Sequence, residues 1–167
     1  KIPRWPFDKF KGVNREIGVQ MKATGEVMAI GRTYEEAIQK SIRSLDIGLH
    51  GFEYCEYDEH ALANPTDERL FQLYSALKDG MEVPYLAELT KMDEFFIYKI
   101  KNIVDFEATV TKDALDDRDY LLKAKKLGFS DYTLAALSGI DESDVKALRQ
   151  KYDLKPSYKM VDTCAAE

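Results

Sequence analysis

Few side chains in this chain of 167 residues are of the types that covalent catalysis needs. A nucleophile needs a base beside it, and the two histidines of the chain are His50 and His60. Cys55 and His60 could form a dyad, but their acidic segment would raise the pKa of the thiol rather than lower it. Cys55, Asp58, Glu59 and His60 could also bind a divalent ion, yet no second ligand pair has metal-site spacing. We therefore interpret this segment as a solvated loop and predict no metal site.

Two further motifs look like active-site features and have simpler structural explanations. Residues 25–31 begin and end with glycine, but they lack the Gly-Lys-Ser/Thr ending of a phosphate-binding loop, with its amide cradle and lysine. We interpret them as a short buried strand bounded by glycines. Asp116 and Asp117 are adjacent carboxylates, and their position is typical of charges at a helix start rather than of a general acid and base.

Charge and composition argue against several classes of partner. The chain carries 24 Lys+Arg and 30 Asp+Glu, a net charge of −6, which disfavours a nucleic-acid surface. Residues 128–152 have helix–turn–helix proportions, but the acidic start of the second helix would repel phosphates. No apolar run approaches the ~20 residues of a membrane span. Two cysteines are too few for a disulfide framework, so we expect a cytoplasmic protein that binds neither nucleic acid nor membranes.

The elements that would position any site fall into two parts, and the first is a short stub. Residues 1–32 contain the plausible strands, of which 25–31 is the clearest. Thr33 and Glu36 form a capping box, which predicts a helix that Gly48 stops. Residues 49–65 are polar and acidic and predict a loop.

The second part predicts a mainly α fold. We expect helices over residues 66–78, 85–89, 117–127, 131–138 and 143–151, a longer one capped by Asp93, and an extended segment over 158–167. The expected apolar faces are Leu70, Leu73, Tyr74 and Leu77 on the first helix, and Phe96, Ile100, Ile103 and Val104, widened by Phe95 and Phe106, on the helix after Asp93. Because the chain opens without Met and closes without a cap or turn, we expect a fragment of a longer protein.

Several motifs in the chain closely resemble the carbamoyl-phosphate synthetase large subunit. They are QMKATGEVMAIGRT at 20–33, KIPRW with Phe7, Lys9 and Phe10 at the start, KLGFSD at 126–131, LRQKYDL at 148–154 and YKMVDTCAAE at 158–167. They occur in the family's order and at about its spacing. Residues 49–93 depart most from the family pattern.

The resemblance implies a place in a longer enzyme that makes carbamoyl phosphate from bicarbonate and glutamine-derived ammonia with ATP, for pyrimidine and arginine biosynthesis. Residues 1–45 would end the carboxyphosphate-forming ATP-grasp half, 46–157 would be the helical oligomerisation domain, and 158–167 would lead into the second half. The family's ATP, Mg²⁺ or Mn²⁺ and K⁺ sites lie outside this segment, so we expect no catalytic residue, cofactor or activity in it. The implied partners are the two ATP-grasp halves, a second copy and the glutaminase small subunit.

The resemblance also implies roles for five residues. The family positions that match Met21 and Glu26 line the internal passage that carries carbamate between the two sites. A buried Glu facing a wet tunnel can stay ionised because water hydrates it. The other interpretation, an ordinary carboxylate at a strand end, stays open. Phe71 widens an already full apolar stripe, which either extends the core contact, the commoner outcome by periodicity alone, or forms an exposed patch. Because their helix falls within the family's oligomerisation domain, the resemblance assigns Leu70, Phe71 and Tyr74 to the oligomer interface.

Two alternatives to a linking and oligomerisation role stay open. The first is an effector-binding regulatory helical domain of the same enzyme, which a pocket lined by convergent polar groups would favour. The second is an independent nucleic-acid-binding helical protein, which a basic stripe on the last full helix would favour.

Overall fold

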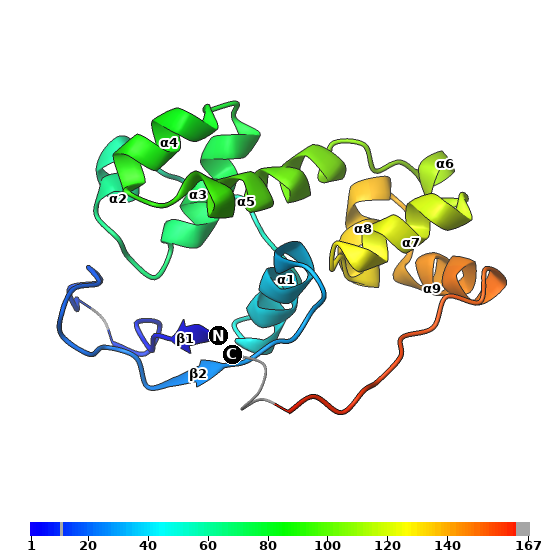
Figure 1. The fold of residues 1–167 in the computed structure, drawn as a ribbon, viewed down its shortest axis with the longest axis horizontal. Helices are drawn as coiled ribbons and strands as arrows, with labels where there is room; N and C mark the ends of the chain where they lie inside the picture. The colour runs from blue at the N-terminus through cyan, green and yellow to red at the C-terminus, as the bar shows by residue number, and fades with distance from the viewer. Residues whose placement is uncertain (11, 163–167) are drawn as a thin grey trace.

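The computed structural model describes residues 1–10 and 12–162 as a helical protein with a small strand stub (Figure 1). The final residues of the predicted 158–167 segment, 163–167, lie outside this description, and 158–162 have no regular structure. Within the described residues there are two strands and nine helices: β1 (Ile2–Arg4), β2 (Gly25–Val27), α1 (Tyr34–Ser44), α2 (Glu59–Ala63), α3 (Arg69–Lys78), α4 (Val83–Thr90), α5 (Glu94–Glu107), α6 (Lys112–Leu115), α7 (Arg118–Lys126), α8 (Asp131–Ser138) and α9 (Glu142–Lys151). The predicted mainly α fold is confirmed.

The helices form two groups that α5 connects. α3 and α4 each pack on α5, and α2 packs on both α3 and α4, while α6 packs on α7 and α8 packs on α9 (Figure 1). α1 lies below the middle of the molecule and contacts α5. The strands lie beside α1, at the edge of the molecule away from α4. None of the described helices combines the length and apolar character needed to cross a membrane.

The two strands pair antiparallel over three residues, with Pro3 opposite Glu26. The predicted strand over 25–31 is therefore too long, because residues 28–31 have no strand conformation. The prediction that it is buried is also wrong, because Gly25 and Glu26 are exposed. A strand needs a partner for its backbone N–H and C=O groups, and β1 offers only three residues.

The capping box at the start of α1 forms with one change from the prediction. Thr33 accepts a hydrogen bond from the Glu36 amide at 3.2 Å, as expected. The Glu36 carboxylate accepts from the amide of Arg32 at 2.8 Å, one residue before the cap. The helix ends at Ser44, and Gly48 adopts a positive φ of 82° in the turn that follows.

The prediction of a loop over residues 49–65 is wrong in part, because the short helix α2 lies within it. Asp58 caps α2 by accepting from the Ala61 amide at 2.7 Å. Leu62 and Phe52 from the same segment are buried in the core. These two apolar residues are ten positions apart in an otherwise acidic segment, so they form no periodic pattern that would predict a helix.

The other helices are found where predicted, with differences at their ends. α3 starts at Arg69, because Thr66 instead closes a turn by accepting from the Glu68 amide at 3.2 Å. Asp93 and Asp117 each cap the helix that follows, as predicted for Asp93 and for the charges at 116–117. The four-residue helix α6 was not predicted, because one turn is too short to show a helical period.

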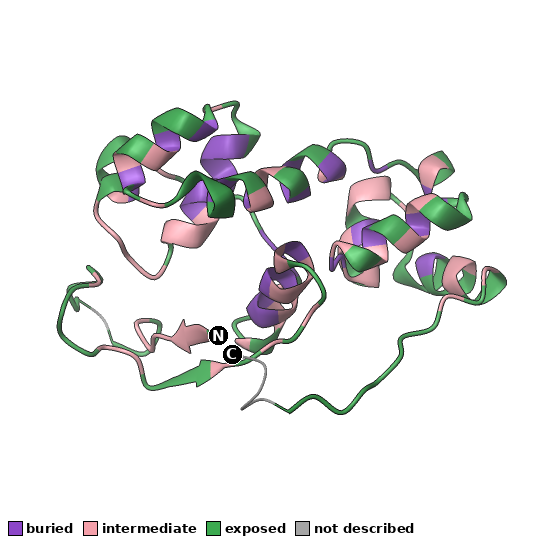
Figure 2. Cartoon of the chain, viewed as in Figure 1, coloured by how far each residue is buried: buried purple, intermediate pink, exposed green. Residues whose placement is uncertain are grey.

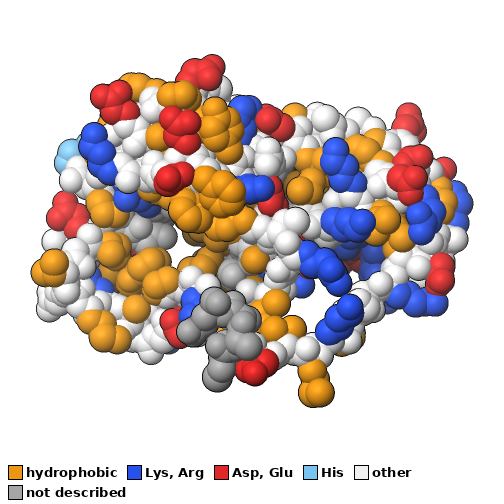
Figure 3. All heavy atoms as spheres, in the orientation of Figure 1, with side chains coloured by type: hydrophobic (Ala, Val, Ile, Leu, Met, Phe, Trp, Pro, Cys, Tyr) orange, Lys and Arg blue, Asp and Glu red, His pale blue; other side chains and the backbone are white. Residues whose placement is uncertain are grey.

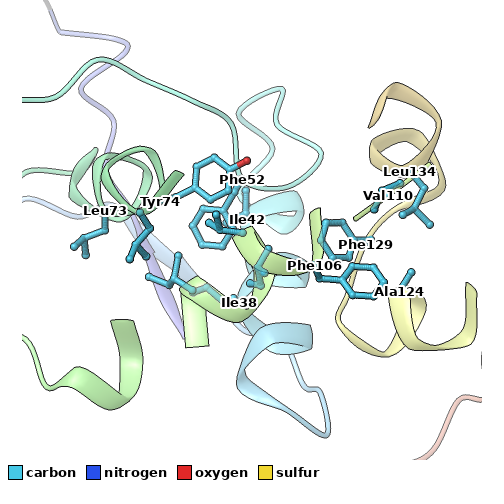
Figure 4. Close-up of a cluster of buried hydrophobic side chains, with 14 of the residues drawn as sticks. Ile38, Ile42, Phe52, Leu73, Tyr74, Phe106, Val110, Ala124, Phe129 and Leu134 are labelled. Atoms are coloured by element: carbon cyan, nitrogen blue, oxygen red, sulfur yellow. The ribbon is translucent and has the colours of Figure 1, made fainter. Parts of the chain in front are cut away.

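One continuous core runs through both helix groups (Figures 2 and 4). On one side, Phe52 stacks on Tyr74 with ring centroids 5.1 Å apart. On the other, Phe106 from α5 contacts Phe129 at 5.5 Å. Ile38 and Ile42 of α1 are buried in the same cluster, so α1 is part of the helical core. Each such side chain contributes roughly 1.5–3 kcal/mol by burial.

Candidate interaction surfaces

α1 is fixed to the turn between α7 and α8 by two hydrogen bonds and one close backbone contact. The Gln39 amide donates to the carbonyl oxygen of Leu127 at 3.0 Å, and the Arg43 guanidinium donates to that of Gly128 at 2.8 Å. Gly128 has a φ of 92°, and a Cβ atom there would lie 2.9 Å from Cα of Glu36. The glycine is therefore required both for its backbone conformation and for the approach of α1.

A buried carboxylate fixes α1 to α5 in a similar way. Asn102 donates from Nδ2 to Oε1 of Glu35 at 2.8 Å, and Nζ of Lys99 lies 3.4 Å from the same oxygen. Burial acts to raise the pKa of Glu35, but the hydrogen bonds from Asn102 and the backbone and the charge of Lys99 together hold it below its usual range. Glu35 therefore stays ionised in the core, with its charge compensated.

A large cavity lies between the strand stub and helices α1 and α3. Its volume is about 1010 Å³, and apolar side chains from the stub, from α1 and from α3 line much of it. Trp5 and Phe7 lie on the stub side, and Ile38 and Leu70 lie on the helix side. Charged side chains also line it, and among them Arg15 pairs with Asp67 and Glu68.

The stub is held over this cavity by contacts with the start of α3. Arg15 pairs with Asp67 at 2.6 Å and with Glu68 at 2.8 Å, and the Ile17 amide donates to the Pro65 carbonyl at 2.7 Å. The hydrogen bond to Asp67 is the main cause of a raised pKa for Arg15. These contacts join the stub to the residues just before α3.

The three predicted interface residues lie in two different environments. Tyr74 is buried, and its hydroxyl donates to Oε2 of Glu107 at 2.5 Å. Leu70 and Phe71 are half-buried and line the cavity beside the stub. Of the three predicted interface residues, only Leu70 and Phe71 are therefore accessible to a partner, and both face the stub of their own chain.

The two predicted passage residues lie on the stub. Met21 is 85% exposed, and Glu26 lies on β2 with its carboxylate 3.9 Å from Nζ of Lys1. Both side chains are open to solvent in this chain.

The residues considered for catalysis do not assemble. The Cys55 thiol accepts from the Ser75 hydroxyl at 3.9 Å, while His60 is an exposed residue of α2. Burial, more than the neighbouring charge of Glu68, raises the pKa of Cys55, which disfavours the thiolate. The described residues contain no group of three His, Cys, Asp or Glu side chains placed to hold a metal ion.

The paired carboxylates and the basic residues of α9 serve the fold. Asp117 caps α7, and Asp116 accepts from Lys151 at 2.6 Å and from the Tyr152 hydroxyl at 2.9 Å. Arg149 is bonded through its guanidinium to Asp131. Two of the three basic residues of α9 thus pair within the chain rather than form a phosphate-binding stripe.

An exposed aromatic strip on α5 is the surface that sequence reasoning missed. The strip consists of Phe95, Phe96 and Tyr98, which are 41–55% exposed. Phe96 was placed on the buried face of this helix, and that prediction is wrong. Its ring instead contacts Phe95 at 5.3 Å and Tyr34 at 5.5 Å between centroids. Figure 3 shows hydrophobic side chains gathered over the first turns of α5. The run of adjacent aromatics was the available signal, since a continuous run of large apolar residues covers more of the helix circumference than one narrow stripe.

Comparison with known proteins assigns the chain to a family. Residues 26–153 match the family described as the carbamoyl-phosphate synthetase large chain, oligomerisation domain. The whole chain is 67% identical to a carbamoyl phosphate synthase large chain of Methanobrevibacter smithii, 62% to one of Methanothermobacter thermautotrophicus, and 48% to one of a Thermoanaerobacter species. It spans 16% of the length of each of these relatives. The resemblance in the sequence motifs is confirmed, and the chain belongs to the oligomerisation-domain family of the carbamoyl-phosphate synthetase large chain.

Proposed function

We propose that the chain is the structural and self-association segment of the large subunit of glutamine-dependent carbamoyl-phosphate synthetase, and that it links the two synthetase halves. The match of residues 26–153 to the oligomerisation domain carries this proposal. The contacts of α1 support the linking role, because this helix follows the strand stub and is bonded to α5 and to the turn between α7 and α8.

The proposed division of the chain keeps the boundaries that the motif resemblance implies. Residues 1–45 end the carboxyphosphate-forming ATP-grasp half, 46–157 form the helical domain, and 158–167 lead into the second half. α1 lies in the first part of this division, but it packs by its buried face into the second and lies within the family match over residues 26–153. A rigid connection of this kind would hold a catalytic half in a fixed orientation on the helical domain.

The chemistry of the proposed parent enzyme is the ATP-dependent formation of carbamoyl phosphate from bicarbonate and glutamine-derived ammonia. It would run in the cytoplasm and serve pyrimidine and arginine biosynthesis. ATP, Mg²⁺ or Mn²⁺, K⁺ and the glutaminase small subunit would bind elsewhere in the enzyme, so the 167-residue chain would be inactive alone. Calorimetric titration of the chain with Mg-ATP tests this, and saturable micromolar binding would contradict it.

Self-association through Leu70 and Phe71 is tested in the intact large subunit. We expect Leu70→Glu to shift its sedimentation toward smaller species across a concentration series, because a charge would enter an apolar contact twice in a symmetric interface. Glu88→Gln, at an exposed position on α4, is a control that should leave assembly unchanged. An unchanged oligomeric state with unchanged circular dichroism would show that Leu70 contacts only its own stub.

A further inference from the structure

We infer that the aromatic strip of α5 is covered, in the intact large subunit, by a part of that same polypeptide outside residues 1–167. This inference rests on the proposed place of the chain within a longer large subunit. The partner is an apolar surface of another domain of the same copy, rather than a second copy.

The chemistry of the strip is that of a contact surface. Phe95 and Phe96 meet edge to face at an interplanar angle of 84°. Nζ of Lys99 lies 5.3 Å from the centre of the Phe95 ring. Aromatic side chains beside a cation are typical of the central residues of protein interfaces, because they bury a large area at low entropic cost. The opposite face of α5 is already buried by the chain, so the strip is left for something else.

The position of the strip favours a partner that also contacts the strand stub. The ring contact with Tyr34 joins the strip to the first turn of α1. Just before α1, the connection from β2 exposes Met28 and Ile30. The apolar surface therefore leads from the helical domain toward the stub, and residues 1–25 of the stub lie outside the oligomerisation-domain match. The relatives of this chain are about six times longer than the chain itself. A large subunit of that length has further domains that could cover the apolar surface between α5 and the strand stub.

The size of the strip decides between a tethered domain and a second copy. A buried aromatic side chain covers about 150–250 Å², so three rings that are about half exposed can bury roughly 200–400 Å². A stable interface between separate molecules needs about 800 Å² on each partner. A domain of the same polypeptide has a millimolar effective concentration, for which a small apolar contact is sufficient.

The test is site-specific photo-cross-linking in the intact large subunit, prepared as a mixture of isotopically light and heavy copies. The photoreactive residue is introduced as Phe95→p-benzoylphenylalanine. The matched control is the same replacement of Tyr132, an aromatic residue of α8 that is 48% exposed and distant from α5 in sequence. We expect position 95 to cross-link within one copy to a peptide outside residues 1–167, with a yield several-fold above that of the control.

Three results would overturn the inference. A light–heavy cross-link at position 95 would identify a second copy as the occupant. A cross-link to a peptide within residues 1–167, or a yield equal to that of the control, would show that no other domain covers the strip. As a second measurement, Phe95→Ser should lower the Tm of the intact subunit more than Tyr132→Ser does, and equal values count against the inference. Sedimentation of the unmodified subunit reports the proposed self-association separately, so either proposal can fail alone.

Discussion

Gly128 lies against the backbone of Glu36 so closely that no side chain fits between the two residues. The contact joins residues that are far apart in sequence, and it seats the turn before α8 on the first turn of α1. The same glycine has a positive φ, so its replacement combines conformational strain with steric overlap.

We expect Gly128→Ala to lower the free energy of unfolding by about 2–4 kcal/mol, since the strain of a positive φ adds to displacement of α1. Gly80→Ala is a matched control, because Gly80 has the same φ of 92° and nothing within 4 Å of its added Cβ. Gly80→Ala should lower the free energy of unfolding by about 1 kcal/mol, because only the strain of the positive φ acts there. Urea unfolding of both variants measures the difference, and equal losses would show that the contact with Glu36 is unimportant.

The Glu35 carboxylate should make stability depend on pH in a defined window. Its pKa is held below its ordinary value of 4.5 in the folded chain, so its contribution is present above about pH 4.5 and is lost as the pH falls through the lower folded pKa. Glu35→Gln removes that titration. The difference in unfolding free energy between wild type and variant should therefore shrink steadily from pH 5 to pH 3. A difference that stays constant over this range would rule out the stated role of Asn102 and Lys99.

Asp131 is the shared acceptor of two cations, Lys125 at 2.8 Å and Arg149 at 2.5 Å. We expect Asp131→Asn to destabilise the chain by about 2–4 kcal/mol, because two mostly buried cations lose their counter-charge. Asp153→Asn is the control, since its pair with Lys155 is well exposed and should contribute almost nothing. Thermal unfolding by circular dichroism compares the two, and similar Tm values would contradict the expectation.

The proposed passage role of Glu26 is tested in the intact enzyme. We expect Glu26→Ala to lower carbamoyl phosphate synthesis while leaving the bicarbonate-dependent partial ATPase reaction close to wild type, because transfer between sites would be impaired and the first site would not. Glu16→Ala, at an exposed position of the same stub, serves as the control. Equal loss of both reactions, or loss of neither, would argue against a passage role.

The sequence was most informative where one residue alone determines the local structure. Asp93 and Gly139 marked helix ends correctly, because an N-cap carboxylate and a positive-φ glycine act within a few residues. The helix within 49–65 and the length of β2 could not be predicted, since they depend on Leu62 reaching the core and on the short partner β1.

The candidate surfaces were predicted only in part, for a related physical reason. Helical periodicity places Tyr74 and Leu70 on one apolar stripe. It does not predict that Tyr74 is buried while Leu70, which lies beside the strand stub, is only half-buried. It also places Phe96 with Ile100, although Phe96 is 41% exposed and its ring contacts Tyr34 at the start of α1. Contacts between segments that are distant along the chain determined these outcomes.

The bonds that hold α1 have a consequence for the order of folding. Gln39 and Leu127 are separated by 88 residues, and Glu35 and Asn102 by 67. During synthesis the N-terminal segment emerges first, so α1 stays without these partners until most of the helical domain has been made. Contacts over such separations also slow folding, because the entropy of loop closure is lost before they form. The apolar face of α1 is therefore exposed longest in the nascent chain, and its docking is expected to be the last step that makes the domain compact.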